Sequence, residues 1–89
     1  MAKRGRLEII KDILTIIKKN KNTIKPTPLL RKTNISSSNF KVYFNELKKR
    51  NLIIERSTEN GKIISITQKG EAFLEKYQTI VNFIEEFEI

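Results

Sequence analysis

Residues 34–70 place a helical pattern directly before two β-branched segments joined by a turn signal. Ser36 is a favoured N-cap, because its hydroxyl can accept a backbone N–H of the first helical turn. The residues that follow at the spacing of one buried helix face are Phe40, Phe44 and Leu47. The sequence thus predicts a helix over 36–50 followed directly by a hairpin over 52–67, an order that suggests DNA binding.

The prediction of a hairpin rests on a change after Arg50 from the period of a helix to β-branched segments typical of strands. Residues 52–56 and 62–67 are rich in β-branched side chains, and Asn60-Gly61 lies between them. This dipeptide tolerates the positive φ angles that a type I′ hairpin turn requires. We therefore expect two strands joined by a type I′ turn.

The outer face of the predicted helix mixes cations, short polar side chains and one small apolar group. It consists of Ser38, Lys41, Val42, Asn45 and Lys49. Such a surface suits the major groove of duplex DNA, where amides reach base edges and lysines reach phosphates. A helix of this kind followed by a β wing predicts double-stranded DNA as a partner.

Each helix candidate also has a plainer interpretation. Lysine is a point charge, so Lys41 and Lys49 suit phosphate contacts better than base reading. An asparagine amide such as that of Asn45 can pair with adenine, but a solvated asparagine is equally compatible with the pattern. Ser37 and Ser38 could bond phosphate or stabilise the helix start, and Val42 could touch a thymine methyl group or simply be exposed.

The hairpin and the N-terminus carry further cations. Arg56 and Lys62 flank the turn and could reach a phosphate or the minor groove, whereas Glu59 would oppose close approach at the tip. A short basic arm that could follow the DNA backbone is formed by Lys3, Arg4 and Arg6.

Length and composition exclude several classes of protein. The 89 residues suffice for one domain, and the chain has neither cysteine nor histidine. Disulfides, thiolate metal sites and the commonest general base are therefore excluded, and the scattered acids form no catalytic pair. We expect no enzymatic activity, no cofactor and no metal. The chain also lacks a membrane-length apolar run and a signal peptide, so we expect a cytoplasmic, nucleoid-associated protein.

Charge is divided unevenly along the chain. Residues 1–70 hold 17 of the 18 cationic and 5 of the 10 acidic residues, a net charge of +12, while residues 71–89 have a net charge of −4. A basic body would approach phosphate while an acidic tail faced away from it. Because a lysine-rich composition also follows from A·T-rich codons, the positions of the lysines carry more weight than their number.

The residues before Asn34 predict two helices. In the first, over 6–20, Leu7, Ile10, Leu14 and Ile17 share one face, and Ile9, Ile13 and Ile16 widen it. Residues 18–27 should form a loop. A short helix would then start at the cap Thr27 with Pro28 in its first position, and would turn Leu29 and Leu30 inward. A tight turn at Asn34 and Ile35 would complete a helix-turn-helix, with Ile35 closing the corner.

A final helix is expected from Thr67 to the C-terminus. Its apolar residues are spaced alternately by four and three, and they are Phe73, Tyr77, Ile80, Ile84 and Phe87. Alternation of this kind is typical of a seam between two helices. At about 1.5 Å per residue the helix is longer than so small a core needs, which favours homodimerisation over packing on the first helix alone.

Three stretches resemble the archaeal winged helix-turn-helix family of small basic transcription regulators and dimeric chromatin proteins. They are RLEIIKDIL, LLRKTNISSSNFKVYFNELKKRNLI and ITQKGEAFLEKY, and the resemblance covers about residues 6–80. It implies that the third helix enters the major groove, that the hairpin acts as the wing, and that the last helix pairs with a second subunit. The groove-facing positions implied are Ser37, Ser38, Lys41 and Asn45, and the wing positions are Arg56 and Lys62.

The chain departs from that family in two places. Asn51 stands at a helix exit where glycine is common, and asparagine also tolerates the left-handed conformation. The last helix is shorter than in the chromatin-type members, which weakens the case for a long antiparallel coiled coil.

The sequence thus predicts an α+β, mostly helical winged helix-turn-helix fold: one domain over 1–89, with a basic body over 1–70 and an acidic dimerisation helix over 71–89. The function favoured is a homodimeric transcriptional regulator that binds duplex DNA through 36–50 and 52–67. A nonspecific chromatin protein and a winged-helix docking module without DNA binding remain as alternatives.

Overall fold

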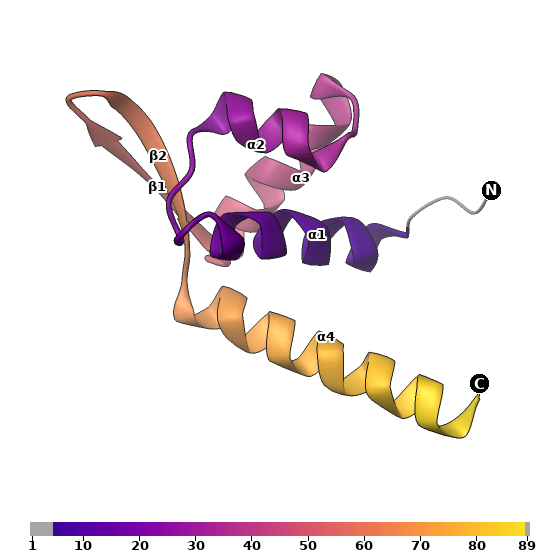
Figure 1. The fold of residues 1–89 in the computed structure, drawn as a ribbon. Helices are drawn as coiled ribbons and strands as arrows, with labels where there is room; N and C mark the ends of the chain where they lie inside the picture. Colours follow the sequence, from indigo (N-terminus) through magenta and orange to yellow (C-terminus); the bar gives the residue numbers. More distant parts are fainter. Residues whose placement is uncertain (1–4, 89) are drawn as a thin grey trace.

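Residues 5–88 are described in a computed structural model of the chain, and they form four helices and one antiparallel hairpin (Figure 1). The elements in chain order are α1 (Arg6–Lys19), α2 (Pro26–Thr33), α3 (Ser37–Lys49), β1 (Ile53–Thr58), β2 (Gly61–Ile66) and α4 (Gln68–Phe87). This α+β arrangement, three helices with a β wing and a C-terminal helix, confirms the predicted fold.

The hydrophobic core lies where α1, α2, α3 and the base of the hairpin meet. Its buried apolar residues are Ile10, Ile13, Leu14, Ile17, Ile24, Leu29, Phe40, Phe44, Leu47, Leu52, Ile53, Ile64 and Ile66. Leu30, Ile35 and Tyr43 pack against this core while remaining half-buried. The apolar faces predicted for the first three helices therefore converge on one centre.

Leu7 was predicted to share the buried face of α1, and that prediction is wrong. It is 58% exposed, because the stripe of α1 that meets the core begins one turn later, at Ile10. Leu7 instead lines a surface groove together with Phe73 of α4.

The second helix starts earlier than its sequence predicted. Its N-cap is Lys25, in extended conformation, and Pro26 rather than Pro28 occupies the first helical position. Proline suits that position because it lacks the N–H that would have no partner there, and it holds the preceding residue extended. Pro28 is still within the first turn, so it breaks no helical hydrogen bond, and the predicted cap at Thr27 is wrong.

The segment predicted as a loop between α1 and α2 contributes a short third partner to the sheet. Ile24 N donates to Ile64 O at 3.1 Å, and Ile64 N donates to Ile24 O at 2.8 Å. Both side chains are buried. The sequence showed only a polar, basic stretch here, and the pairing depends on the fold bringing it beside β2.

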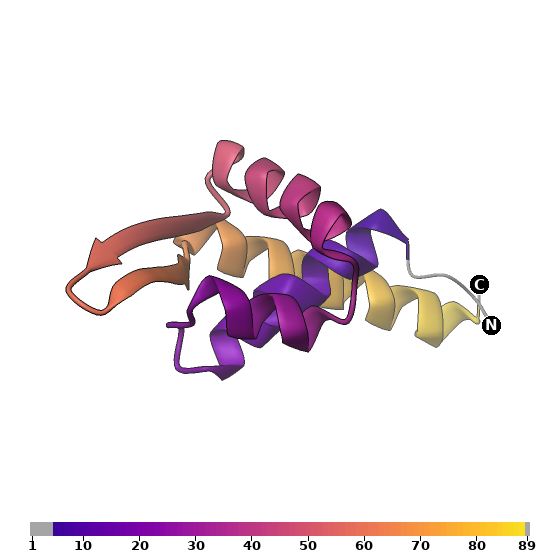
Figure 2. The ribbon, with the colours of Figure 1, turned by 90° about the horizontal axis from the view of Figure 1, so that it is seen from above.

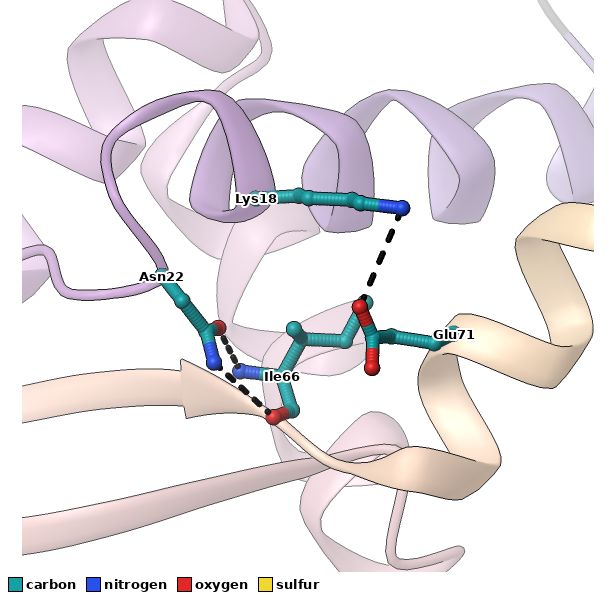
Figure 3. Close-up of polar contacts among 4 residues, drawn as sticks. All are labelled: Lys18, Asn22, Ile66 and Glu71. Carbon is teal, nitrogen blue, oxygen red and sulfur yellow. Dashed lines mark hydrogen bonds and ion pairs between the residues drawn. The ribbon is translucent and has the colours of Figure 1, made fainter.

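The same loop holds the end of β2 through Asn22 (Figure 3). Asn22 Oδ1 accepts from Ile66 N at 2.7 Å, and Asn22 Nδ2 donates to Ile66 O at 3.5 Å. The side-chain amide thus substitutes for a neighbouring strand. Lys21 and Asn22 both adopt left-handed φ angles, 59° and 58°, which turn the amide toward the strand.

The hairpin has the predicted strands but a different turn. Thr58 pairs with Gly61, so Glu59 and Asn60 are the two central residues, and neither has positive φ. A type I′ turn requires positive φ at both, so that prediction is wrong. Gly61 alone takes the left-handed side, with φ 107°, and Thr58 Oγ1 accepts from Asn60 N at 3.2 Å. The positive φ that glycine tolerates is therefore found at the first residue of β2, directly after the two central residues of the turn.

The start of α4 is fixed by Thr67 and Gly70. Thr67 Oγ1 accepts from Gly70 N at 3.1 Å, which confirms the predicted cap, and it donates to Asn51 O at 2.6 Å. Asn51 has φ 62°, the left-handed conformation expected of it. Gly70 is buried, and a Cβ there would lie 2.4 Å from Leu52 O, so only glycine lets the helix approach the turn this closely.

Candidate nucleic-acid interface

The entry to α3 is set by three consecutive residues. Asn34 has φ 56° and ends α2, Ile35 packs half-buried at the corner, and Ser36 is extended. Ser36 Oγ accepts from Asn39 N at 3.2 Å, so the predicted N-cap is confirmed. The turn fixes the direction in which α3 leaves α2.

The rotation of α3 about its own axis is fixed by its inner face. Phe40, Phe44 and Leu47 are buried, and the rings of Phe40 and Phe44 stack with centroids 5.4 Å apart. Since these side chains occupy the core, the residues about half a turn away have to face solvent. The core therefore determines which side chains α3 offers to a partner.

The exposed face of α3 carries every helix residue predicted to contact DNA. All six are exposed: Ser37, Ser38, Lys41, Val42, Asn45 and Lys49. Val42 is 63% exposed, so its side chain is available to a partner. A shallow groove of about 500 Å³ runs along this face, lined by Val42, Asn45, Glu46, Lys49 and Arg50.

The hairpin cations are exposed but do not share a face. Arg56 pairs with Ile63, and Lys62 pairs with Ser57, one position further along. Because side chains alternate along a strand, Arg56 and Lys62 lie on opposite faces of the ribbon. The sequence placed both beside the turn but could not show this separation.

Lys48 connects α3 to the hairpin. Its Nζ lies 3.3 Å from Glu55 Oε1 on β1 and 5.0 Å from the centroid of the Phe44 ring. The ion pair links the exit of α3 to the first strand. Lys48 lies in the last turn of α3, and Figure 2 shows the hairpin projecting from that end of the helix. The C-terminal end of α3 and the first strand of the hairpin are thus in direct contact.

Comparison with models of known protein families shows which family the chain belongs to. The family model described as winged helix-turn-helix matches residues 3–85. This chain belongs to the winged helix-turn-helix family. In the terms of that family, the hairpin is the wing. No curated protein matches the chain.

Two solved structures share the winged helix-turn-helix fold. The crystal structure of Sso10a-2, a DNA-binding protein from Sulfolobus solfataricus, is 22% identical, with a TM-score of 0.77 over 96% of this chain and 86% of that one. F93 from STIV, a winged-helix DNA-binding protein, is 19% identical, with a TM-score of 0.75 over 89% of this chain and 91% of that one. Both likenesses concern the fold.

The predicted seam on α4 of this winged-helix protein is divided between two environments. Phe73 and Tyr77 are half-buried on the side of α1, with Lys11 Nζ 5.8 Å from the centroid of the Tyr77 ring. Ile80, Ile84 and Phe87 are between 41% and 58% exposed. Phe83, which the seam did not include, is also exposed, and its ring lies 4.8 Å from that of Phe87.

Sequence reasoning missed a cluster of charges at the C-terminal end of α3. Glu46 forms ion pairs with both Arg6 of α1 and Arg50, the C-cap of α3. The Glu46–Arg50 pair follows helical i, i+4 spacing, which could have revealed it. Arg6 is distant in sequence, so only folding brings it here, and Lys3 and Arg4 of the predicted arm lie outside the described residues.

Along residues 5–88, none of the helices combines the length and apolar character needed to cross a membrane. Within the same range, His, Cys, Asp and Glu side chains do not gather in the groups of three or more that could hold a metal ion.

Proposed function

We propose that this protein binds double-stranded DNA with α3 in the major groove and the wing beside it. The observation that carries the proposal is the exposed polar and cationic face of α3, held outward by the burial of Phe40, Phe44 and Leu47. A DNA-reading helix needs such a face, because base edges are reached only by side chains not used in the core. The DNA-binding proteins with similar folds support the same use of the fold.

Within this surface the roles divide by chemistry. Lys41 and Lys49 contact phosphates of the DNA. Near the start of α3, the hydroxyls of Ser37 and Ser38 donate hydrogen bonds to the DNA backbone. Asn45 reads a base edge, and Val42 lies against a thymine methyl group. In the wing, Lys62 and Arg56 reach the phosphates on either side of the ribbon.

The distribution of charge supports this orientation. The basic segment over 1–70 carries a net charge of +12, whereas the segment over 71–89 carries −4. DNA attracts the first and repels the second. The protein therefore approaches DNA with α3 and the wing, and the acidic residues 71–89 stay away from the phosphates.

The direct test is fluorescence anisotropy of a labelled random-sequence duplex across a salt series. Replacing Lys41 and Lys49 with glutamine should lower the slope of log K against log salt by about 0.9 for each phosphate that the variant no longer neutralises. Lys76→Gln on α4 is the matched control and should leave the slope unchanged. A wild-type protein that does not bind at low salt would contradict the proposal and leave the docking module as the better account.

We further propose that the protein acts as a homodimer through α4. Support comes from the exposed apolar side chains Ile80, Phe83, Ile84 and Phe87, which another copy of α4 could cover. Phe73 and Tyr77 extend this surface toward the body. Light scattering at micromolar concentration measures the oligomeric state, and a monomer at every accessible concentration would contradict this part.

A transcriptional regulator is favoured over a chromatin protein. The supporting observation is that Asn45 and Val42, which can read bases, are both exposed on α3 and line one groove. Competition of the labelled complex with DNA from upstream of the protein's own gene tests this. Much stronger competition than by random DNA is expected of a cytoplasmic, nucleoid-bound regulator, whereas equal competition would indicate chromatin-type binding.

A further inference from the structure

At the C-terminal end of α3, two arginines pair with one carboxylate, and a lysine from a third element binds the backbone of one of those arginines. Arg6 begins α1, Arg50 caps α3, and Lys69 lies in the first turn of α4. Glu46 Oε1 pairs with Arg6 Nη2 and lies 3.4 Å from Arg50 Nε. Lys69 Nζ donates to Arg50 O at 2.9 Å. We refer to Glu46, Arg6, Arg50 and Lys69 as the Glu46 cluster.

Within the Glu46 cluster the anion is covered and the cations are open. The side chain of Glu46 is 18% exposed, whereas those of Arg6 and Arg50 are 55% and 63% exposed. One carboxylate balances one of the three cations, so the cluster keeps a net positive charge. Each guanidinium has several N–H donors in a planar fork, and the bond to Glu46 leaves donors for another acceptor.

The position of the cluster connects it to the proposed DNA surface. Arg50 and Glu46 line the groove on the exposed face of α3 together with Asn45 and Lys49. Arg50 also lines a neighbouring groove of about 380 Å³, shared with Arg6 and Lys69. Arg50 is the C-cap of α3, and β1 begins three residues later at Ile53, so DNA that touches both elements passes beside Arg50.

We infer that the Glu46 cluster is a second contact with the DNA backbone, in which Arg6 and Arg50 bind a phosphate and Glu46 holds their guanidiniums in position. A phosphate offers the oxygen acceptors that a pair of guanidinium forks binds best. Glu46 is a positioning residue: it orders two long, flexible side chains before DNA arrives, so that less conformational entropy is lost on binding. The inference rests on the proposed DNA-binding function.

Two roles of Glu46, repulsion of DNA by its charge and positioning of the arginines, predict opposite changes in DNA affinity when Glu46 is replaced with glutamine. If its negative charge merely repelled DNA, Glu46→Gln would tighten binding. If Glu46 positions the arginines, the same substitution should weaken binding about tenfold at low salt, through the ordering cost of two side chains. Glu75→Gln, on the exposed surface of α4, is the matched control and should tighten binding slightly or leave it unchanged.

The experiment is the anisotropy titration of a random duplex with the full chain across a salt series. Arg6→Gln and Arg50→Gln should each weaken binding about tenfold, as expected when one hydrogen bond to a charged group is removed, and lower the salt slope by about 0.9. In the Arg6→Gln/Arg50→Gln background, Glu46→Gln should no longer weaken binding, because no guanidinium remains to be positioned. A circular dichroism melt of each variant verifies that it is folded.

Two results would overturn the inference. The first is tighter binding by Glu46→Gln than by wild type, and the second is an unchanged salt slope for both arginine variants. If these occur while Lys41→Gln still lowers the slope, the proposed function stands and only the cluster's role fails. If wild type does not bind DNA at all, both fail together. Should Glu46→Gln not fold, the exposed Arg6 and Arg50 variants decide the question alone.

Discussion

The half of α4 nearest the wing packs on the body of the protein, whereas the half that ends at Phe87 presents its apolar side chains to solvent. Gly70 is buried, and Phe73 and Leu74 pack against the core. Figure 1 shows the distal half of α4 extending away from the other elements. One apolar period therefore runs through two different environments, and periodicity alone does not distinguish the half that packs on the core from the half that is exposed.

Contacts from α1 add to the packing of the proximal half on the body. Lys11 lies over the Tyr77 ring, and Lys18 Nζ lies 3.8 Å from Glu71 Oε1 (Figure 3). The pKa of Lys11 is raised above its ordinary value of 10.5, chiefly by its hydrogen bond to Asp12. These contacts accompany the close approach of Gly70 to Leu52, while Phe83 and Phe87 are exposed.

The largest expected effect is that of Gly70→Ala. A Cβ there would lie 2.4 Å from Leu52 O and 2.6 Å from Ile66 Cγ1, so the proximal half of α4 would have to shift. We expect a loss of about 3 kcal/mol in the free energy of unfolding, measured by thermal and urea denaturation. Gly5→Ala, which meets nothing within 4 Å, is the control. Equal stability of the two variants would show that α4 does not depend on this contact.

Phe73→Ala should have the next largest effect on stability. The ring is half-buried against the core, so its removal should cost about 2 kcal/mol, less than the value for a fully buried phenylalanine. Urea denaturation of a dilute sample, in which association is minimal, measures it. Phe83→Ala is the matched variant from the distal half, and a similar cost there would erase the difference between the two halves.

Ile84→Gln together with Phe87→Gln should separate association from folding. Both side chains are exposed, so the free energy of unfolding of the single chain should change by less than about 0.5 kcal/mol. If α4 forms the dimer, light scattering should give the mass of one chain for the variant and of two for wild type. The wild-type melting temperature should also rise with protein concentration, and that of the variant should not. An unchanged dimer in the variant would place the interface elsewhere.

The smallest effect is expected for Lys18→Gln. Its ion pair with Glu71 joins two side chains that are each about half exposed, and such pairs contribute roughly 0–1 kcal/mol. We expect a decrease in stability below about 0.5 kcal/mol that disappears at high salt. Glu71→Gln should give the same result. A larger, salt-independent decrease would indicate that the pair fixes α4 on α1 more firmly than its geometry suggests.

Much of the fold could be predicted from local patterns. The caps Ser36 and Thr67, the left-handed Asn51 and the buried spacing of α3 are short-range properties, since each depends on residues within a turn or two. Two of the errors were also local in origin, whereas the exposure of Leu7 depends on where α1 meets the core. Pro26 and Pro28 are both suited to the first position of α2, and Pro26 occupies it. The centre of the hairpin turn is formed by Glu59 and Asn60 rather than by Asn60 and Gly61.

The candidate site was predictable only where one element supplies it. The exposed face of α3 follows from its buried face, because 3.6 residues per turn relate the two. The Glu46 cluster draws on α1, α3 and α4, and the separation of Arg56 from Lys62 depends on strand register. Neither arrangement has a signature within a single stretch of sequence.

The sequence by itself therefore determined the order of the elements, the caps of α3 and α4 and the face that α3 turns outward, because these follow from backbone geometry and hydrophobic period over a few residues. Tertiary structure alone decided that Asn22 and Ile24 hold β2, that Gly70 meets Leu52, and that Arg6 meets Glu46. The physical reason is that these contacts join residues far apart in the chain, whose proximity exists only once the common core has formed.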